Sequence, residues 1–212
     1  MEEPVCKIWD SLKLGETVLV EYNSAISPVM GFYHLLKWAR KRGYPVLVDD
    51  VLDTLYLYAT HMKLAGFDTN ILNEVKVIKE GGTLNVGQVV ARIGINEASI
   101  RRSNYESVFG SLLRDRPVIN PVLGAGKLFM LTESARELLT TLNVILSYTG
   151  DERRIAFFFI NLDLINGSCT CIPCLLEELA TTVIRVVREG KYLKFSVIKS
   201  VNREIEGMEV RI

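Results

Sequence analysis

Apolar residues follow two alternating patterns in the first part of the chain. Residues 16–22, 45–50 and 75–79 are rich in β-branched residues around short apolar cores and predict strands of a sheet. Between them, residues 28–42 and 51–65 place apolar residues every three or four positions, which predicts amphipathic helices. The order strand, helix, strand, helix, strand predicts a parallel sheet with helices on its faces.

The first of these helices has clear boundary signals. Ser27 is a good N-cap, Pro28 suits the first helical position, and Gly43 suits the position after the last turn. The apolar face is made of Val29, Phe32, Leu36 and Ala39. A basic run near the end of the helix is interpreted as solvated charge that complements the helix dipole, and not as a patch for an anionic partner. It consists of Lys37, Arg40, Lys41 and Arg42.

The second half continues this alternation and then changes. The pattern predicts, in chain order, a strand at 86–95, a helix at 98–114, a loop rich in proline and glycine at 117–126, a helix at 132–147 and a wholly apolar central strand at 155–160. The tail alternates apolar and polar residues and predicts an antiparallel β-meander. We therefore expect one α/β domain over residues 1–212, with a mostly parallel central sheet, helices on both faces and the meander at its C-terminal end.

Composition and charge exclude several classes of protein. The chain has 212 residues, of which 49% are hydrophobic, and this is enough to bury a core in one domain. Lys and Arg total 25, as do Asp and Glu, so there is no overall attraction to nucleic acid or to an anionic membrane. The first residues lack the pattern of a signal peptide, and the longest apolar run, 155–160, is too short to span a bilayer. We expect a cytoplasmic protein.

Several segments resemble motifs of the RecA/KaiC-like P-loop ATPases, in the same order along the chain. Residues 15–22 resemble the strand that enters the Walker A loop, and residues 42–50 resemble the next strand, which ends in two carboxylates. Residues 65–68 are similar to the GWD motif after the second helix, 154–163 to the Walker B strand, and 197–199 to a late strand whose lysine reaches a neighbouring subunit's nucleotide. The resemblance implies a three-layer RecA/KaiC-like fold. The chain also resembles a small archaeal family of proteins of unknown function, which implies no activity.

The phosphate-binding loop of the ATPase family is altered in this chain. A working loop, G-x-x-x-x-G-K-[ST], needs glycines so that backbone N–H groups face the phosphates, a lysine for their oxygens and a hydroxyl for Mg²⁺. In the matching stretch, 22–29, Tyr22 and Ser27 replace the glycines. Pro28 replaces the lysine and Val29 replaces the hydroxyl. We therefore expect a degenerate ATPase, with no ATP cofactor and no ATP hydrolysis.

Other positions of the family pattern are only partly kept. Residues 124–127 end in a lysine but lack the leading glycine of a phosphate loop, so we interpret them as a turn. Asn161 stands where the Walker B strand usually ends in an aspartate, and Asp163 is the alternative carboxylate two residues later. Lys199 keeps the lysine of the family's K-x-R pair, whereas Val201 replaces its arginine.

Asp49 and Asp50 are the catalytic candidates. In KaiC-like proteins a carboxylate at this place activates the attacking water, so the resemblance implies that role for one of them. The alternative is an ordinary strand end, where an acidic residue caps the first N–H groups of the next helix. Because a base without a phosphate cradle has nothing to attack, we favour the capping interpretation.

The cysteines Cys169, Cys171 and Cys174 are the candidate metal ligands. They follow the strand 155–160, at the carboxyl end of the sheet where α/β proteins usually bind ligands. Three thiolates and a fourth ligand from elsewhere would suit Zn²⁺ or an iron–sulfur cluster. The pattern of two CxxC pairs is absent, which favours a disulfide or redox pair, or small residues without chemistry, over a metal at this cluster.

Two functions are compatible with these patterns. The first, which we favour, is a non-catalytic KaiC/RecA-like module that acts through a protein partner or by self-assembly, with a homodimer expected in place of a six-membered ring. The second is a small-anion or nucleotide-binding protein or enzyme that uses the crevice at the end of the first strand. There the next helix begins, and Lys199 or Lys127 would supply positive charge. The candidate ligand-binding residues of that crevice are Asn23, Ser24, Ala25, Ile26 and Ser27.

Overall fold

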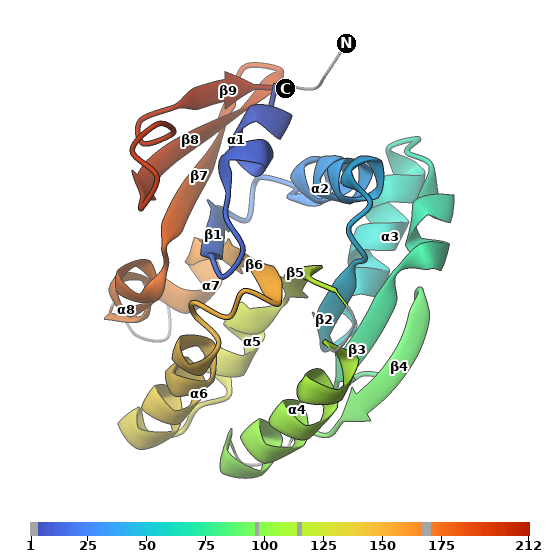
Figure 1. The fold of residues 1–212 in the computed structure, drawn as a ribbon, viewed down its shortest axis with the longest axis vertical. Helices are drawn as coiled ribbons and strands as arrows, with labels where there is room; N and C mark the ends of the chain where they lie inside the picture. Colours follow the sequence, from blue (N-terminus) through green and yellow to red (C-terminus); the bar gives the residue numbers. More distant parts are fainter. Residues whose placement is uncertain (1–3, 96–97, 114–115, 167–170) are drawn as a thin grey trace.

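In the computed structural model, one sheet organises the chain (Figure 1). The structure describes residues 4–95, 98–113, 116–166 and 171–212. Within these residues, nine strands are ordered β4-β3-β2-β5-β6-β1-β7-β8-β9. The pairs from β4 to β7 are parallel, and β7, β8 and β9 are antiparallel. The strands are β1 (Thr17–Tyr22), β2 (Leu47–Val51), β3 (Lys76–Glu80), β4 (Gln88–Ile93), β5 (Val118–Leu123), β6 (Arg154–Asn161), β7 (Thr182–Glu189), β8 (Tyr192–Ser200) and β9 (Glu209–Arg211).

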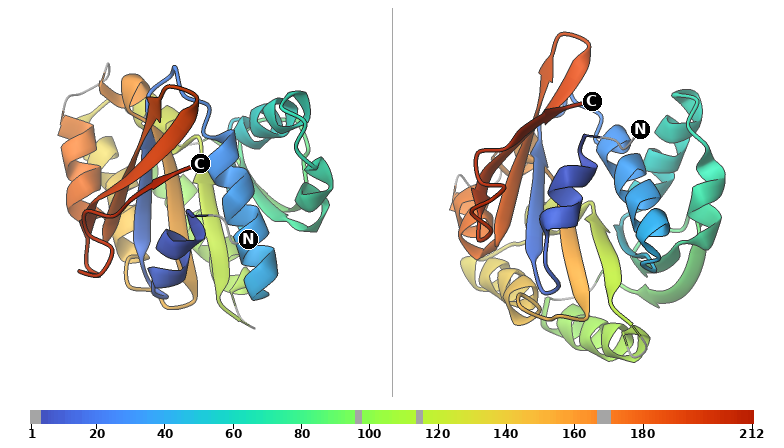
Figure 2. Two further views of the ribbon diagram at one scale, coloured as in Figure 1. Left: turned by 90° about the horizontal axis from the view of Figure 1, so that it is seen from above. Right: turned by 45° about the horizontal axis from the view of Figure 1, so that its top comes forward.

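Helices cover both faces of this sheet (Figure 2). One face carries α1 (Cys6–Ser11), α2 (Val29–Arg42) and α3 (Thr54–Leu64), which is followed by the 3-10 helix η1 (Thr69–Glu74). The other face carries α4 (Ala98–Leu112), α5 (Ala125–Met130), α6 (Ala135–Ser147), α7 (Leu162–Asn166) and α8 (Cys171–Leu179). None of the helices in the described ranges is long and apolar enough to cross a membrane.

Side chains of the central strands alternate between the two faces. In β6, Phe157 and Phe159 pack against the α1–α3 side, and Ala156 and Phe158 pack against the α4–α8 side. A parallel strand that is covered on both faces is normally apolar throughout. The polar residues at the ends of β2 and β3 are therefore exceptional, and all of them are buried: Asp49, Asp50, Lys79 and Glu80.

The predicted α/β architecture with a C-terminal meander is confirmed, and most predicted elements lie within a few residues of their expected bounds. Gly43 ends α2 in the left-handed conformation, with φ of 73°, as the sequence indicated. The predicted N-cap is wrong. Pro28 occupies the cap position of α2 and no side chain bonds to the helix start, because Ser27 lies one residue too early to reach the first free N–H groups.

The loop predicted at 117–126 is also wrong, because this segment contains the central strand β5 and the start of α5. Proline is rare in central strands, since it cannot donate to a neighbouring strand. Here Asn120 compensates for Pro121. Its side-chain Nδ2 donates to the carbonyl of Leu47 in β2 at 2.8 Å. Backbone pairing between β2 and β5 resumes just beyond, where Asp49 is opposite Val122. A side-chain amide thus lets a proline-containing strand lie inside the sheet.

Candidate functional site

The loop after β1 is held by a carboxylate of the chain itself. Asp163, in the first turn of α7, accepts hydrogen bonds from the backbone N–H of Ser24 and from the side-chain amide of Asn23, both at 2.8 Å. Asn161 donates to the Ser24 hydroxyl at 3.0 Å. The bonds from Ser24 and Asn23 lower the pKa of Asp163. Two donors that would face a bound anion at this loop are therefore occupied by Asp163.

The other residues predicted to bind a ligand at this loop do not converge on one site. Ile26 is buried, and its N–H donates to the carbonyl of Asn23 at 2.9 Å. Ala25 and Ser27 are exposed. Lys199 donates to the carbonyls of Glu177 and Glu178, at 2.6 and 3.2 Å, in the last turn of α8. A cation suits a helix C-terminus, and the structure thus places Lys199 as a cap of α8.

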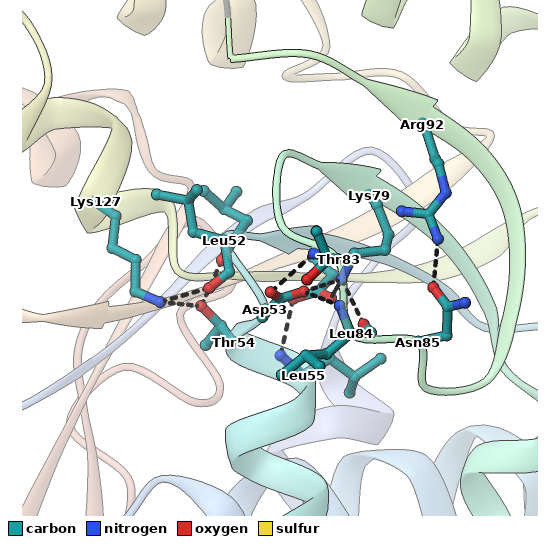
Figure 3. Close-up of polar contacts among 12 residues, drawn as sticks. Leu52, Asp53, Thr54, Leu55, Lys79, Thr83, Leu84, Asn85, Arg92 and Lys127 are labelled. Carbon is teal, nitrogen blue, oxygen red and sulfur yellow. Dashed lines mark hydrogen bonds and ion pairs between the residues drawn. The ribbon is translucent and has the colours of Figure 1, made fainter.

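At the carboxyl ends of β2 and β3, Lys79 lies between two carboxylates (Figure 3). Its Nζ is 2.6 Å from Asp50 Oδ2 and 2.6 Å from Asp53 Oδ1, and it donates to the carbonyl of Leu84 at 2.8 Å. The second oxygen of Asp50 accepts the N–H of Leu55, in the first turn of α3, at 2.8 Å. All polar atoms of the Asp50 and Lys79 side chains are thus engaged. This geometry favours the capping interpretation of Asp50.

The turn between β2 and α3 has an unusual backbone. Leu52 and Asp53 have φ values of 49° and 59°, in the left-handed region that residues other than glycine seldom adopt. The Asp53 carboxylate holds this turn by accepting the N–H groups of Thr83 and Leu84, at 2.9 and 3.0 Å. The contacts of Figure 3 therefore fix the turn firmly at the end of β2.

Lys127 of α5 approaches the same turn from the neighbouring strand end. Its Nζ donates to the carbonyl of Leu52 at 3.1 Å and to the hydroxyl of Thr54 at 2.9 Å. Partial burial lowers the pKa of Lys127, and the nearby Asp50 and Asp53 oppose that shift. Lys127 therefore belongs to the β2 turn, and within the described residues its side chain bonds to that turn and not to the loop after β1.

Asp49 points to the opposite face of the sheet from Asp50. Its Oδ2 accepts the hydroxyl of Tyr105 at 2.7 Å and the amide of Asn120 at 3.1 Å. Arg154 donates through Nη1 to Asn120 at 2.7 Å. Two atoms of this buried network, Asp49 Oδ1 and Arg154 Nε, have no hydrogen-bond partner in the described part of the chain. Burial raises the pKa of Asp49 to about 6, and its hydrogen bonds with Tyr105 and Asn120 oppose that rise.

Glu80 extends this network along β3. Its Oε2 lies 3.7 Å from Arg101 Nε, which is too far for a hydrogen bond, and within the described ranges its carboxylate has no closer polar partner. Arg101 donates through Nη2 to the Thr141 hydroxyl at 3.0 Å. Burial raises the pKa of Glu80 to about 7, and the charge of Asp49 raises it further. The α4 side of the sheet thus holds two buried carboxylates that are incompletely paired.

A pocket of about 60 Å³ lies beside these carboxylates, between α4, α5 and α6. Its polar lining is made of Asp49, Glu80, Arg101, Arg102, Tyr105, Thr141, Tyr148 and Arg154. Its apolar walls are Val122, Leu128, Phe129, Val144, Ile145 and Phe158. A larger hollow of about 900 Å³ shares Arg101 and Leu128 with the pocket and extends over the first turn of α6. The arrangement combines a small polar and apolar chamber with a wider outer groove.

The cysteine cluster lies away from this pocket in the sequence, around the start of α8. Cys169 falls outside the described residues. Cys171 is disulfide-bonded, and Cys174 is an exposed thiol. Among the residues that the structure describes, no group of three or more His, Cys, Asp or Glu side chains could hold a metal ion. The disulfide of Cys171 agrees with one favoured interpretation, a disulfide pair, and a metal, the less favoured alternative, is not tested by these residues.

Sequence reasoning missed most residues of the α4-side network. Lys79 and Glu80 carried a signal, since two charged residues follow the apolar pair Val77 and Ile78 at the carboxyl end of a strand. Arg154 carried a weaker one as the first residue of the central strand. No local pattern marked Arg101 or Tyr105, because their partners are distant in the sequence: Tyr105 and Asp49 are 56 positions apart.

Comparisons with known proteins agree with the fold. A family model described as "Pyrococcus protein of unknown function, DUF257" matches residues 7–211. The solved structure of PH0250 from Pyrococcus horikoshii OT3 is 37% identical and covers 96% of both chains, with a TM-score of 0.86. The KaiC-like protein PH0186 from the same organism is 11% identical over 93% of this chain and 84% of that chain, with a TM-score of 0.60. PH0321, solved in complex with an unknown peptide, is 13% identical over 98% and 96%, with a TM-score of 0.63. None of the curated proteins matches the chain.

Proposed function

The chain belongs to the family described as "Pyrococcus protein of unknown function, DUF257", and from this premise we propose that it is a non-hydrolysing module with a KaiC-like fold that acts by binding another protein chain. The observation that carries the proposal is the position of Asp163. Its carboxylate accepts the Ser24 N–H and the Asn23 amide at the loop where a phosphate would bind in a working ATPase.

Hydrolysis of ATP needs parts that this loop does not offer. Phosphoryl transfer depends on cations that offset the charge of the phosphates, together with backbone N–H groups that face them. Pro28 and Val29 stand in place of the lysine and the hydroxyl, and a phosphate would meet the negative charge of Asp163. These features support a function that does not turn over nucleotide.

The edge of the sheet at β4 supports binding of a protein chain. β4 pairs with β3 on one side and is the last strand of the sheet in the described residues. Gln88 N–H donates toward β3, and the carbonyl of Ile93 accepts the N–H of Gly81, so both ends of β4 face β3. The pairing with β3 shifts register between Val77 and Ile78, and beyond that shift the backbone groups of β4 alternate, so those of Arg92 face outward. Such an edge can accept a further strand.

We propose that a second copy of this chain adds its own β4 to this edge, which gives a homodimer. The complex of PH0321 with an unknown peptide supports uptake of a protein chain by this fold, although that relative is only 13% identical. A two-fold dimer that pairs β4 with β4 would continue the sheet from one copy into the other and cover the β4 edge of each copy.

Light scattering tests this proposal with two variants of one residue. Arg92→Pro removes the outward N–H, whereas Arg92→Ala keeps it, and both lose the contact of the Arg92 side chain with Asn85. We expect a dimer mass for the unmodified chain and for Arg92→Ala, and a monomer mass for folded Arg92→Pro. A monomer at high concentration without any substitution, or an unchanged dimer for Arg92→Pro, would contradict the proposed contact.

A further inference from the structure

We propose that the pocket between α4, α5 and α6 binds a small molecule through an uncharged carboxamide group. In this arrangement Glu80 accepts the N–H of the amide, and Arg101 donates to its carbonyl oxygen. The pocket lies on the α4 side of the sheet, away from the loop after β1. The proposal therefore does not depend on whether the chain hydrolyses nucleotide or forms a dimer.

The gap between Glu80 and Arg101 carries the inference. The two side chains approach to 3.7 Å, beyond hydrogen-bond distance, and Glu80 accepts no hydrogen bond within the described residues although only 6% of it is exposed. Buried polar groups in folded proteins are nearly always hydrogen-bonded. A carboxylate and a guanidinium that both line a pocket, and that form an ion pair without a hydrogen bond between them, therefore keep hydrogen-bonding capacity for a third group.

Two buried side chains of the pocket lining, Asp49 and Arg154, also have polar atoms without a hydrogen-bond partner among the residues that the structure describes. Asp49 is 1% exposed and Arg154 is 2% exposed, and both line the pocket. One oxygen of Asp49 and the Nε of Arg154 lack a partner in the described part of the structure. Unmet hydrogen-bonding capacity of both signs is thus concentrated here. On the other face of the same strands, by contrast, all polar atoms of the Asp50 and Lys79 side chains have partners.

An uncharged amide fits these groups better than a charged ligand. Two carboxylates and the guanidinium groups of Arg101 and Arg154 already face one another here. The third arginine of the lining, Arg102, is paired with Glu106, so an added full charge would be buried without a matching counter-charge. An amide carries one donor and one acceptor side by side, in the order that the carboxylate and the guanidinium require. It can therefore bridge Glu80 and Arg101 and add no net charge.

The size of the pocket sets the size of the bound group. A volume of about 60 Å³ is well under the ~150 Å³ of an apolar cavity that takes up benzene. Only a head of a few heavy atoms fits. The apolar walls, among them Leu128 and Ile145, suit the carbon chain next to the amide. The remainder of the ligand would extend past Leu128 into the outer groove.

Calorimetric titration of the whole chain with hexanamide, hexanoate and hexylamine tests the proposal. These probes all have six carbons and differ in the head group, which is a neutral amide, an anionic carboxylate or a cationic ammonium. We expect hexanamide to bind at least tenfold more tightly than either charged analogue. Shortening it to butanamide should weaken binding by up to about fourfold for each methylene removed from the apolar walls. Equal binding of the three hexyl probes, or no detectable binding of hexanamide at millimolar concentration, would overturn the proposal.

Variants separate the role of Glu80 from a purely structural one. Glu80→Gln should weaken hexanamide binding about tenfold, because a charged acceptor is replaced by a neutral one. Glu74→Gln, which changes an exposed residue that lines neither the pocket nor the outer groove, is the matched control and should leave the affinity unchanged. Unchanged affinity of folded Glu80→Gln would contradict the assignment. If that variant does not fold, Val144→Phe, which fills the pocket, should abolish binding, and retained binding would overturn the proposal.

The pH dependence of binding gives a second readout. Glu80 must be ionised to accept the amide N–H strongly, and its pKa is raised to about 7. The charged or titratable groups that face it are Asp49 on β2, Arg101 and Tyr105 on α4, and Arg154 on β6. We expect hexanamide to bind more tightly at pH 8 than at pH 6, and Glu80→Gln to remove most of this difference. The same pH dependence in Glu80→Gln would overturn the role given to Glu80.

Discussion

The two faces of β2 and β3 carry polar clusters of opposite character. On the α3 side, Asp50 and Lys79 form a pair in which every polar atom has a partner. On the α4 side, Asp49 and Glu80 are two carboxylates with incomplete pairing, and burial raises the pKa of both. Alternation along two adjacent strands is enough to separate them. A saturated cluster stabilises a turn, whereas an unsaturated cluster next to a pocket retains the capacity to bind.

The largest effect is expected when the saturated cluster is broken. Lys79→Met leaves Asp50 buried without its cation, and we expect the free energy of unfolding to fall by about 3–5 kcal/mol. Urea denaturation measures the loss. Lys76→Met, in the same strand but exposed, should change stability by less than about 0.5 kcal/mol. A similar small change for both variants would show that the Lys79 pair contributes little.

A somewhat smaller loss of stability is expected when Asn120 is changed, beside Pro121 in β5, which lies between β2 and β6. Asn120→Ala removes the donor to the carbonyl of Leu47 and the acceptor of Arg154, both of which are buried. Leaving these groups unpaired should lower the free energy of unfolding by about 2–4 kcal/mol. The exposed Asn143→Ala serves as the control in chemical denaturation. If Asn120→Ala were as stable as the control, the side-chain bridge would not explain how proline enters β5.

The incompletely paired cluster on the α4 side should make the stability of the chain depend on pH, through Asp49. The pKa of Asp49 is raised to about 6, so the folded state binds its proton more tightly than the unfolded state does. The resulting stabilisation is complete below the unfolded pKa of about 4 and is lost as the pH rises through 6. The unmodified chain should lose this stabilisation between pH 4 and pH 8, whereas Asp49→Asn should not. The free energy of unfolding of the variant, relative to that of the unmodified chain, should therefore rise by about 1–3 kcal/mol over this range. Unfolding titrations at both pH values would contradict this if the difference between the chains stayed constant.

The smallest effect on stability is expected at the loop after β1. Asp163 is exposed, so Asp163→Asn should leave the melting temperature almost unchanged. It removes a negative charge next to the Ser24 N–H, and added sulfate should then stabilise this variant more than the unmodified chain. Thermal melting across a sulfate series measures the difference. Asp151→Asn, a half-buried carboxylate that also accepts a backbone N–H at another turn, is the control. An equal response of the two variants would argue against an anion site at the loop.

The sequence predicted the fold better than it predicted the site. Periodicity located most strands and the long helices because each is a local pattern. It predicted neither α7 nor α8, and it failed at β5 and α5, where Pro121 and the nearby glycines suggested a loop. Only the distant contact of Asn120 with Leu47 makes that strand possible. The adjacent aspartates Asp49 and Asp50 were recognised as a pair, yet their division between two faces depends on burial of the whole strand.

Sequence patterns did not predict which side chains from distant elements would contact each other. Lys199 was expected near the loop after β1 through its position in a family motif, and it caps α8 through contacts that no motif encodes. Arg101 and Tyr105 come from a helix whose register against the sheet is fixed only when the core assembles. Polar residues at the ends of buried strands are the sequence signal with the most value for a site of this kind.

The central claim, that the chain does not use its loop after β1 to bind and hydrolyse nucleotide, has one direct test. Calorimetric titration with Mg²⁺ and ATP, together with a phosphate-release assay on the same sample, measures binding and turnover at once. The account predicts no saturable binding at millimolar ATP and no release of phosphate above the protein-free control. Saturable, Mg²⁺-dependent binding with a turnover that vanishes in Asp50→Asn would contradict it.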